Sequence, residues 1–203
     1  MAQGRIGVTV KINNQLMQPK YVEHVVTRFL SPNTATCGDN GTYITLVYRK
    51  GYPNAYEPML FLGILKKSAL FRFITLFEMA AYDKPWNKER FTILYFLLST
   101  EYNLRVCIKF KVSSDATFKS ASTVYPSANW SEREICDMFG IHFQDNSDLR
   151  RLLNDYGFEG YPLRKDFPLT GYIEVRYDDE SQTMLYETVE LSQEFRVFIS
   201  SSP

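Results

Sequence analysis

The segment Asn129–Gly140 reads NWSEREICDMFG and carries side chains that can do chemistry. Glu132 and Glu134 can exchange protons, Cys136 can act as a nucleophile, and carboxylates with a thiol can bind a metal ion. The same side chains can also hold a structure together through ion pairs and hydrogen bonds. The geometry dictated by their spacing separates these alternatives.

The pattern predicts a helix across this segment. Ser127 can cap its start, and Gly140 is the residue typical of the position just past a helix end. On such a helix Arg133 and Asp137 are four residues apart and can pair directly. A second face carries Trp130, Glu134 and Met138, and a third stripe carries Glu132 and Cys136.

This geometry disfavours a catalytic or metal site. Glu132 and Glu134 point about 200° apart on a helix, so they cannot form an acid–base pair by themselves. The chain has two histidines, His24 and His142, whereas a zinc site needs three or four suitably placed ligands. Neighbouring apolar and acidic residues raise the pKa of a thiol such as Cys136. The favoured interpretation is structural: the charges tie the helix to neighbouring backbone or to another chain.

A second charged segment, DNSDLRRLLNDYGFEGYPLRKDFPLTG, runs from Asp145 to Gly171. Ser147 and Asp148 are expected to start a short helix through Asn154, on which Arg150 and Arg151 can pair with carboxylates. The glycines and prolines that follow force an irregular path, at Gly157, Gly160, Pro162 and Pro168. Arg164, Lys165 and Asp166 lie on it. The basic pair there is poorly suited to phosphate, because no following helix supplies amide groups.

Composition limits the other possibilities. With 203 residues, 45% of them hydrophobic, the chain can bury a core. Its longest apolar runs, Met59–Leu65 and Phe91–Leu98, fall short of the roughly 20 residues that a membrane helix needs. Three dispersed cysteines, Cys37, Cys107 and Cys136, are too few for an iron–sulfur cluster held by this chain alone. The chain has no block of basic residues interleaved with aromatic ones, which is the pattern that would indicate nucleic-acid binding.

Charge is unevenly distributed along the chain. Residues 1–130 hold 16 basic and 8 acidic side chains, a balance of +8, and residues 131–203 hold 7 and 15, a balance of −8. Such asymmetry arises either from two surfaces of one soluble body or from two faces that meet different partners.

The elements that must position these residues form an α+β fold. Helical spacing is found at residues 14–30 and 59–69, and strand patterns at 42–48, 70–83, 90–99 and 104–112. The predicted organisation is an N-terminal domain of helices against a mostly antiparallel sheet at 1–120. A motif region of short helices and an irregular charged loop follows at 121–171, and an extended, partner-binding tail at 172–203. The tail lacks a sustained helical period or a hairpin turn, so we expect it to lie extended across a neighbouring subunit.

The charged motifs as a group resemble a known family. SEREICDMFGIHF, DLRRLLNDYGFEGYPLRKDFPL and EVRYDD with QEFRVF are similar to the thirty-kilodalton core subunit of proton-pumping respiratory complex I of the mitochondrial type. The match runs from Trp130 to Asp178 and resumes at Gln193–Phe198, whereas residues 1–120 agree only in the order of elements. Five positions depart from the usual pattern: Asn146-Ser147 stand where the family usually has His-Pro, and Cys136, Tyr161 and Thr188 replace an aromatic residue, His and Pro.

The resemblance implies a subunit of the hydrophilic arm of NADH:ubiquinone oxidoreductase that carries no cofactor and has no activity of its own. The complex as a whole uses NADH, FMN, iron–sulfur clusters and ubiquinone. The implied partners are the quinone-site subunit and the subunit holding the terminal iron–sulfur cluster. The implied location is peripheral, on the matrix side of the mitochondrial inner membrane, or alternatively on the cytoplasmic face of a bacterial plasma membrane.

Family-motif or interface roles, with none catalytic or metal-binding, are carried over to Trp130, Glu132, Arg133, Glu134, Asp137, Gly140, Asp148, Arg150, Arg151, Gly157, Gly160, Pro162, Arg164, Lys165, Asp166, Arg176 and Arg196. Two alternatives stay open. One is the related subunit of a membrane-bound hydrogenase or ion-pumping oxidoreductase. The other is a free enzyme that uses Glu132, Glu134, Cys136 and His142.

Overall fold

The computed structural model describes residues 35–39, 44–48, 57–69, 71–102, 104–114 and 117–196. The chain divides into two units, Met1–Lys165 and Asp166–Pro203. The helix expected at 14–30 and the end of the tail at 197–203 lie outside the described residues. The domain boundaries expected near 120 and 171 stay predictions.

A five-stranded sheet organises the first unit. Its order is β1 (Ala35–Asp39), β2 (Ile44–Tyr48), β5 (Leu104–Val112), β4 (Phe91–Ser99) and β3 (Thr75–Asp83). The β2–β5 pair is parallel and the other three pairs are antiparallel. This confirms an α+β fold with a mostly antiparallel sheet. Strand β1 was not expected from the sequence, and β3 begins at Thr75 rather than at Leu70.

One face of this sheet is the floor of the hydrophobic core. Along β4 the side chains of Phe91, Ile93, Tyr95 and Leu97 are fully buried, and from Ile93 onward they alternate with half-buried ones. This is the period of two that places successive side chains on opposite faces of a strand. Strand β5 contributes its own alternate positions, including Phe110, whose ring meets that of Tyr95 edge-on.

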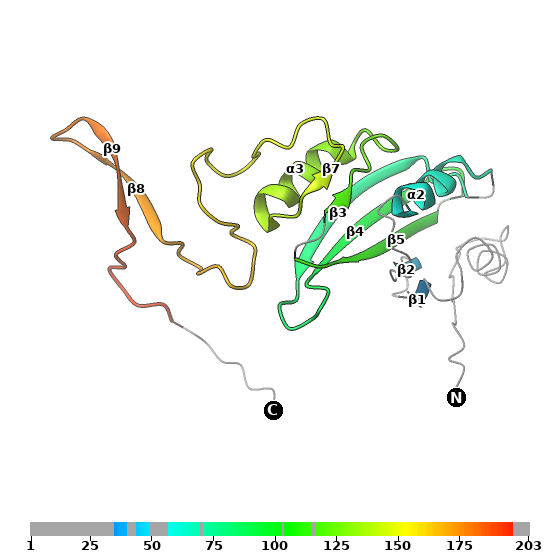
Figure 1. Cartoon of the computed structure of the whole chain (residues 1–203), viewed down its shortest axis with the longest axis horizontal. Helices are drawn as coiled ribbons and strands as arrows, with labels where there is room; N and C mark the ends of the chain where they lie inside the picture. The colour runs from blue at the N-terminus through cyan, green and yellow to red at the C-terminus, as the bar shows by residue number, and fades with distance from the viewer. Residues whose placement is uncertain are drawn as a thin grey trace, which may run out of the picture. The chain divides into compact units, whose positions relative to one another are not determined.

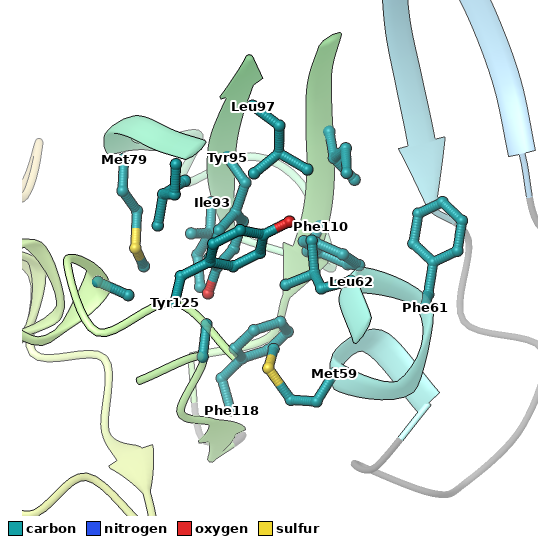
Figure 2. Packing of buried hydrophobic residues seen from close by; sticks show 14 of the residues in the cluster. Met59, Phe61, Leu62, Met79, Ile93, Tyr95, Leu97, Phe110, Phe118 and Tyr125 are labelled. Atoms are coloured by element: carbon teal, nitrogen blue, oxygen red, sulfur yellow. The ribbon is translucent and has the colours of Figure 1, made fainter. Parts of the chain in front are cut away.

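Two helices, α2 (Glu57–Lys67) and α3 (Ala128–Phe139), contribute to the same core, with α2 over the sheet and α3 beside β3 (Figure 1). Figure 2 shows Met59 and Leu62 of α2 turned toward the β4 and β5 side chains, with Tyr125 beside them. The Tyr125 hydroxyl donates a hydrogen bond to the carbonyl of Phe73 at 2.7 Å. Helix α3 is therefore anchored on the sheet both through the core and through the segment that precedes it.

The residues that flank α3 form little regular secondary structure. Strand β6 (Phe118–Lys119) pairs in parallel with β7 (Phe143–Gln144), which brings the residues before and after α3 side by side. Residues 145–165 then form neither helix nor strand. The helix expected from Ser147 to Asn154 is therefore wrong, and the reason is given by the contacts of α3 described below.

The second unit contains a hairpin of β8 (Ile173–Asp178) and β9 (Thr183–Thr188). The expectation that the tail lacks a hairpin turn is wrong. The Asp178 carboxylate accepts hydrogen bonds from the backbone N–H and the hydroxyl of Ser181, and Gln182 adopts a left-handed φ of 53°. These two features build the turn without the Asn-Gly or Asp-Gly pair that marks the shortest hairpins.

Among the described residues, no helix is long and apolar enough to cross a membrane.

Candidate functional site

Helix α3 ends as the sequence predicts but begins differently. Gly140 has a left-handed φ of 72° and its N–H bonds to the carbonyl of Cys136, which is the expected C-terminal cap. Ser127 stands at the start of the helix but makes no side-chain cap. Its hydroxyl donates instead to the carbonyl of Leu76 in β3 at 3.1 Å, so Ser127 fastens the helix to the sheet.

Glu132 is fully buried and connects three separate parts of the first unit. Its Oε1 accepts the backbone N–H of Ala121 at 2.6 Å, and its Oε2 accepts the Ser120 hydroxyl at 2.6 Å and the Asn146 amide at 2.7 Å. The donors come from the residues before α3 and from those after β7. This carboxyl group therefore fixes both chain segments that flank the helix.

All three of these partners of Glu132 are neutral donors. Burial raises the pKa of this carboxyl group, and the hydrogen bonds from Ser120, Ala121 and Asn146 only partly oppose the effect. Asn146 stands where the resemblance expects histidine. Its amide nitrogen donates to Glu132 while its amide oxygen accepts the backbone N–H of Asp148 at 2.9 Å.

Asp137 lies on another side of the helix and is also buried, with 2% of its surface exposed. Its Oδ2 accepts the backbone N–H groups of Leu152, Leu153 and Asn154 at 2.8–3.1 Å. Its Oδ1 accepts the Arg151 guanidinium at 2.8 Å and the Asn154 amide at 3.0 Å. One side chain thus satisfies the backbone donors of a whole turn of irregular chain.

These contacts explain two differences from the sequence-based expectation. Residues 152–154 donate to a distant carboxylate rather than to carbonyls four residues back, so the segment does not become a helix. The expected i,i+4 pair between Arg133 and Asp137 does not form. Arg133 instead donates to the carbonyls of Arg150 and Arg151 at 3.1 and 3.3 Å, and its guanidinium lies 5.2 Å from the Trp130 ring.

The Asp137 carboxylate is held in its ionised form. Burial alone would raise its pKa, but the N–H groups of Asn154 and Leu153, the Asn154 side chain and Arg151 together hold the pKa at about 2. Its ionised state is therefore part of the folded structure at neutral pH.

The far end of the irregular segment returns to the helix end and to the sheet. Arg164 donates through Nε to the carbonyl of Phe139 at 2.6 Å, and its guanidinium lies 4.4 Å from the ring centre of Tyr161. The next backbone N–H, of Lys165, donates to the buried carboxylate of Asp83 at 2.9 Å. Asp83 also receives two hydrogen bonds from Arg90, at 2.7 and 2.8 Å.

We call this set of contacts the loop clamp: Asp83, Glu132, Arg133, Asp137 and the last carbonyls of α3, with the segments they hold at 120–121 and 146–165. Within it the charged side chains of Glu132, Arg133, Asp137 and Arg164 each bind backbone groups of the chain itself.

The motif residues outside the loop clamp are exposed side chains, turn residues or members of the second unit. Trp130, Glu134 and Arg150 have exposed side chains, and Arg150 pairs with Asp148 at 2.8 Å. Of the turn residues, Gly160 needs glycine for its φ of 113°, whereas Gly157 and Pro162 lie on the loop without such a requirement. In the second unit Asp166 and Arg196 are exposed, and Arg176 forms a two-bond pair with Glu187 across the hairpin.

The arrangement of the described side chains does not favour metal binding, a nucleophilic cysteine or phosphate binding. Within the described ranges, no three His, Cys, Asp or Glu side chains are grouped so that they could hold a metal ion. Burial and the neighbouring Asp137 raise the pKa of the Cys136 thiol, although Arg151 opposes them, so a reactive thiolate is disfavoured. His142 is exposed, and Arg164 is engaged by Phe139 rather than open to a phosphate.

Sequence reasoning missed several members of the clamp. Ser120, Asp83 and Asn154 carry no motif spacing that links them to α3, because they are distant in the chain. Asn146 does carry a signal. It departs from the usual His-Pro, and the structure places it on the buried carboxyl group of Glu132.

Comparison with known proteins gives a consistent family. The C subunit of the NADH-quinone oxidoreductase of Parvibaculum lavamentivorans is 51% identical over 142 residues, 70% of this chain and 71% of that protein. NADH-ubiquinone oxidoreductase subunit 9 of Acanthamoeba castellanii is 53% identical, over 68% of this chain and 70% of that protein. The C subunit of the NADH-quinone oxidoreductase of Maricaulis maris is 54% identical, over 65% of this chain and 66% of that protein. The chain thus aligns with about two thirds of the length of these relatives.

A solved structure is also similar. A chain of the membrane-bound sulfane sulfur reductase, an archaeal respiratory membrane complex, matches with a TM-score of 0.57 and 25% identity, over 73% of this chain and 86% of that one. The family described as respiratory-chain NADH dehydrogenase, 30 Kd subunit, matches residues 58–173, which include the sheet from β3 onward and the whole loop clamp. On this match and on about 50% identity to the relatives above, the chain belongs to the 30 kDa subunit family of respiratory-chain NADH dehydrogenase.

Proposed function

We propose that this chain is a core scaffold subunit of the hydrophilic arm of a proton-pumping NADH:quinone oxidoreductase. It carries no redox centre and has no activity alone. Its role is to support assembly and to hold neighbouring subunits while electrons pass from NADH to the quinone.

The observation that carries this proposal is the apolar face of the β8–β9 hairpin. In the strand register Ile173, Val175 and Tyr177 lie opposite Thr188, Tyr186 and Met184, and these alternate pairs share one face. Their large apolar side chains are between 44% and 72% exposed. The other face carries charged residues, including the Arg176–Glu187 pair.

A two-stranded hairpin with one exposed apolar face needs a further surface to cover that face. An isolated two-stranded hairpin is at best marginally stable in water, and contiguous exposed apolar side chains mark an interaction surface. A protein partner that covers this face would bury its large apolar side chains together. The tail forms a hairpin instead of the extended segment expected from the sequence, and we propose that it binds its partner through the apolar face of that hairpin.

The loop clamp supports the same proposal from the first unit. Its charges hold residues 146–165 in one path, and no arrangement for acid–base or nucleophilic catalysis accompanies them among the described residues. A segment fixed so firmly without regular structure is suited to present a defined surface to another subunit.

The family supplies the finer proposals. The partners are the subunits of the quinone site and of the terminal iron–sulfur cluster. NADH, FMN, iron–sulfur clusters and ubiquinone are bound elsewhere in the complex. The location is peripheral, on the matrix side of the mitochondrial inner membrane or on the cytoplasmic face of a bacterial plasma membrane.

A second candidate is a subunit of another respiratory membrane complex. The resemblance to a chain of the sulfane sulfur reductase favours it, since the fold is shared at a TM-score of 0.57. Identity of about 50% to the NADH-quinone oxidoreductase subunits, against 25% to that chain, favours the first candidate.

Two matched lysine substitutions on the hairpin test the proposal. Val175→Lys puts a charge on the apolar face, and Glu174→Lys puts the same side chain one residue away on the charged face. Each variant is expressed in the source cells in place of the native chain. The amount of assembled complex and its NADH:quinone reductase activity are then measured on native gels.

We expect Val175→Lys to reduce the amount of assembled complex severalfold, because a buried lysine without a partner costs a few kcal/mol, and Glu174→Lys to have little effect. The proposal is wrong if the native chain migrates apart from every NADH-oxidising assembly. It also fails if both variants assemble equally well.

A further inference from the structure

A groove of about 370 Å³ runs between strand β3 and helix α3 in the first unit. It is lined by Phe77–Ala81 of the strand, by one side of the helix and by Leu163 of the irregular segment. The contacts of the loop clamp hold Leu163 in place, because its N–H donates to the carbonyl of Met138 at 3.2 Å and the nearby Lys165 is held by Asp83.

The strand in this groove has an open side. Strand β3 is last in the sheet and pairs with β4 alone among the described strands. A register irregularity between Leu76 and Glu78 disturbs its first residues, while Met79–Asp83 pair regularly. Within the described part of the chain, no hydrogen bond outside the β3–β4 ladder reaches the backbone of residues 77–81.

Open strand edges are usually protected by bulges, charges or a covering element. Here the irregularity at Phe77 and the charge of Glu78 give partial protection, but the helix beside the edge does not cover it. The result is a strand edge next to a helix, with room between them, and this is the arrangement in which a peptide adds to a sheet as a further strand.

The groove combines apolar and acidic side chains. Of its lining residues Met79, Ile135 and Phe139 are buried, whereas Phe77 is 43% exposed. Glu78 and Glu134 also line it, one from the strand and one from the helix, and both have exposed side chains. Neither forms an ion pair with any described residue.

We propose that this β3–α3 groove binds an extended basic segment of another subunit. The segment pairs its backbone with the open edge of β3, places apolar side chains against Phe77 and Met138, and sets Lys or Arg beside Glu78 and Glu134. The proposal rests on the proposed function, because it needs a partner within the complex, but it concerns a different surface from the hairpin. It also gives Glu134, a motif residue that the loop clamp does not use, a role in binding.

Photo-crosslinking within the assembled complex tests the groove. Phe77 is replaced by p-benzoylphenylalanine, a conservative aromatic change, and Trp86, which is 79% exposed in the β3–β4 connection, is replaced in the same way as a control. A third variant carries p-benzoylphenylalanine at Met138, on the helix wall. Each complex is purified and irradiated, and the crosslinked peptide is identified by mass spectrometry.

We expect the probes at Phe77 and Met138 to capture the same short segment of one other subunit, with Lys or Arg among its apolar residues. The probe at Trp86 should not capture it. Adding Glu78→Lys and Glu134→Lys together should lower the yield from Phe77 at least about fivefold, since two attractions become repulsions. The matched reversals Glu89→Lys and Glu159→Lys, outside the groove, should leave it within about twofold.

A chain that is present in the complex but gives no crosslink from Phe77 overturns the inference and leaves the proposed function intact. Capture of an acidic segment, of this chain's own residues or of a second copy overturns it equally. A chain found outside every complex refutes the proposed function instead.

Discussion

At the scale of single residues, the pKa values of two buried carboxyl groups on α3 are shifted in opposite directions. Glu132 meets neutral donors and burial raises its pKa, whereas Asp137 meets a guanidinium and backbone amides and its pKa falls to about 2. Burial raises both pKa values, and the difference depends on how strongly the partners oppose it: the donors to Glu132 do so only in part, whereas the amide groups and Arg151 around Asp137 outweigh it.

The low pKa of Asp137 makes a prediction about stability and pH. Its ordinary value is 3.8, so the folded state binds this proton more weakly than the unfolded chain does. The stabilisation is therefore complete above about pH 4 and is lost as the pH falls from there toward 2, and it amounts to about 2 kcal/mol. Asp137→Asn should remove it at neutral pH and should also flatten the acid dependence in this window.

The measurement is denaturant unfolding of the purified chain at a series of pH values from 7 down to 2. Asp155→Asn is the control, because Asp155 is an exposed aspartate of the same segment and its change should stay within about 0.5 kcal/mol. Equal effects of the two substitutions at pH 7 would show that the Asp137 contacts contribute nothing to the fold.

At the scale of elements, the end of α3 is where helix, loop and sheet meet. Gly140 adopts a left-handed φ of 72°, and a Cβ atom there would lie 2.5 Å from a guanidinium nitrogen of Arg164 and 2.6 Å from the Tyr161 ring. The glycine is thus required both by its backbone conformation and by the close approach of the stacked pair.

Gly140→Ala should destabilise the first unit by about 2–4 kcal/mol, adding the penalty of the left-handed conformation to that of displacing Tyr161 and Arg164. Gly157→Ala is a matched control in the same segment, because a Cβ atom there meets nothing within 4 Å. Unfolding midpoints of the two variants give the comparison. A smaller loss for Gly140→Ala than for Gly157→Ala would contradict the described geometry.

Elements with local signals could be predicted from the sequence. Helix α3 and strands β4 and β5 have a complete period and a clear end, and their bounds agree with the expectation to within about one residue. The helix expected at 147–154 failed because its backbone donors are taken by Asp137, which is distant in the chain. The hairpin was missed because its turn depends on the Asp178 side chain and on a left-handed glutamine.

The candidate site was predictable in kind but not in detail. The residue types and their helical spacing already favoured a structural role over catalysis. Which partner each charge takes was not predictable, because Arg133 and Asp137 each prefer a group on the loop to one another. Folding decides between such alternatives by satisfying buried backbone groups, which a sequence pattern does not record.

At the scale of the whole molecule, each of the two units carries one surface suited to a partner. The second unit has the apolar face of the β8–β9 hairpin, and the first has the β3–α3 groove. The loop clamp fixes the segment that contributes Leu163 to the lining of the groove. In the assembly role that we propose, the motif charges act inside the chain and these two surfaces bind other subunits.

The central claim is that the motif charges act through structure and assembly rather than through chemistry. Arg151→Ala, with Arg150→Ala as its neighbour control, tests this most directly. The Arg151 side chain is mostly buried against Asp137, and its removal should lower the free energy of unfolding by about 1.5–3 kcal/mol. The Arg150 side chain is 70% exposed, and its removal should change that free energy little.

The quantity to measure is NADH:quinone reductase turnover per assembled complex, together with the amount of complex in the membrane. We predict that Arg151→Ala lowers the amount of complex and leaves turnover per complex unchanged, and that Arg150→Ala changes neither. A normal amount of complex with slowed quinone reduction in Arg151→Ala would contradict the account.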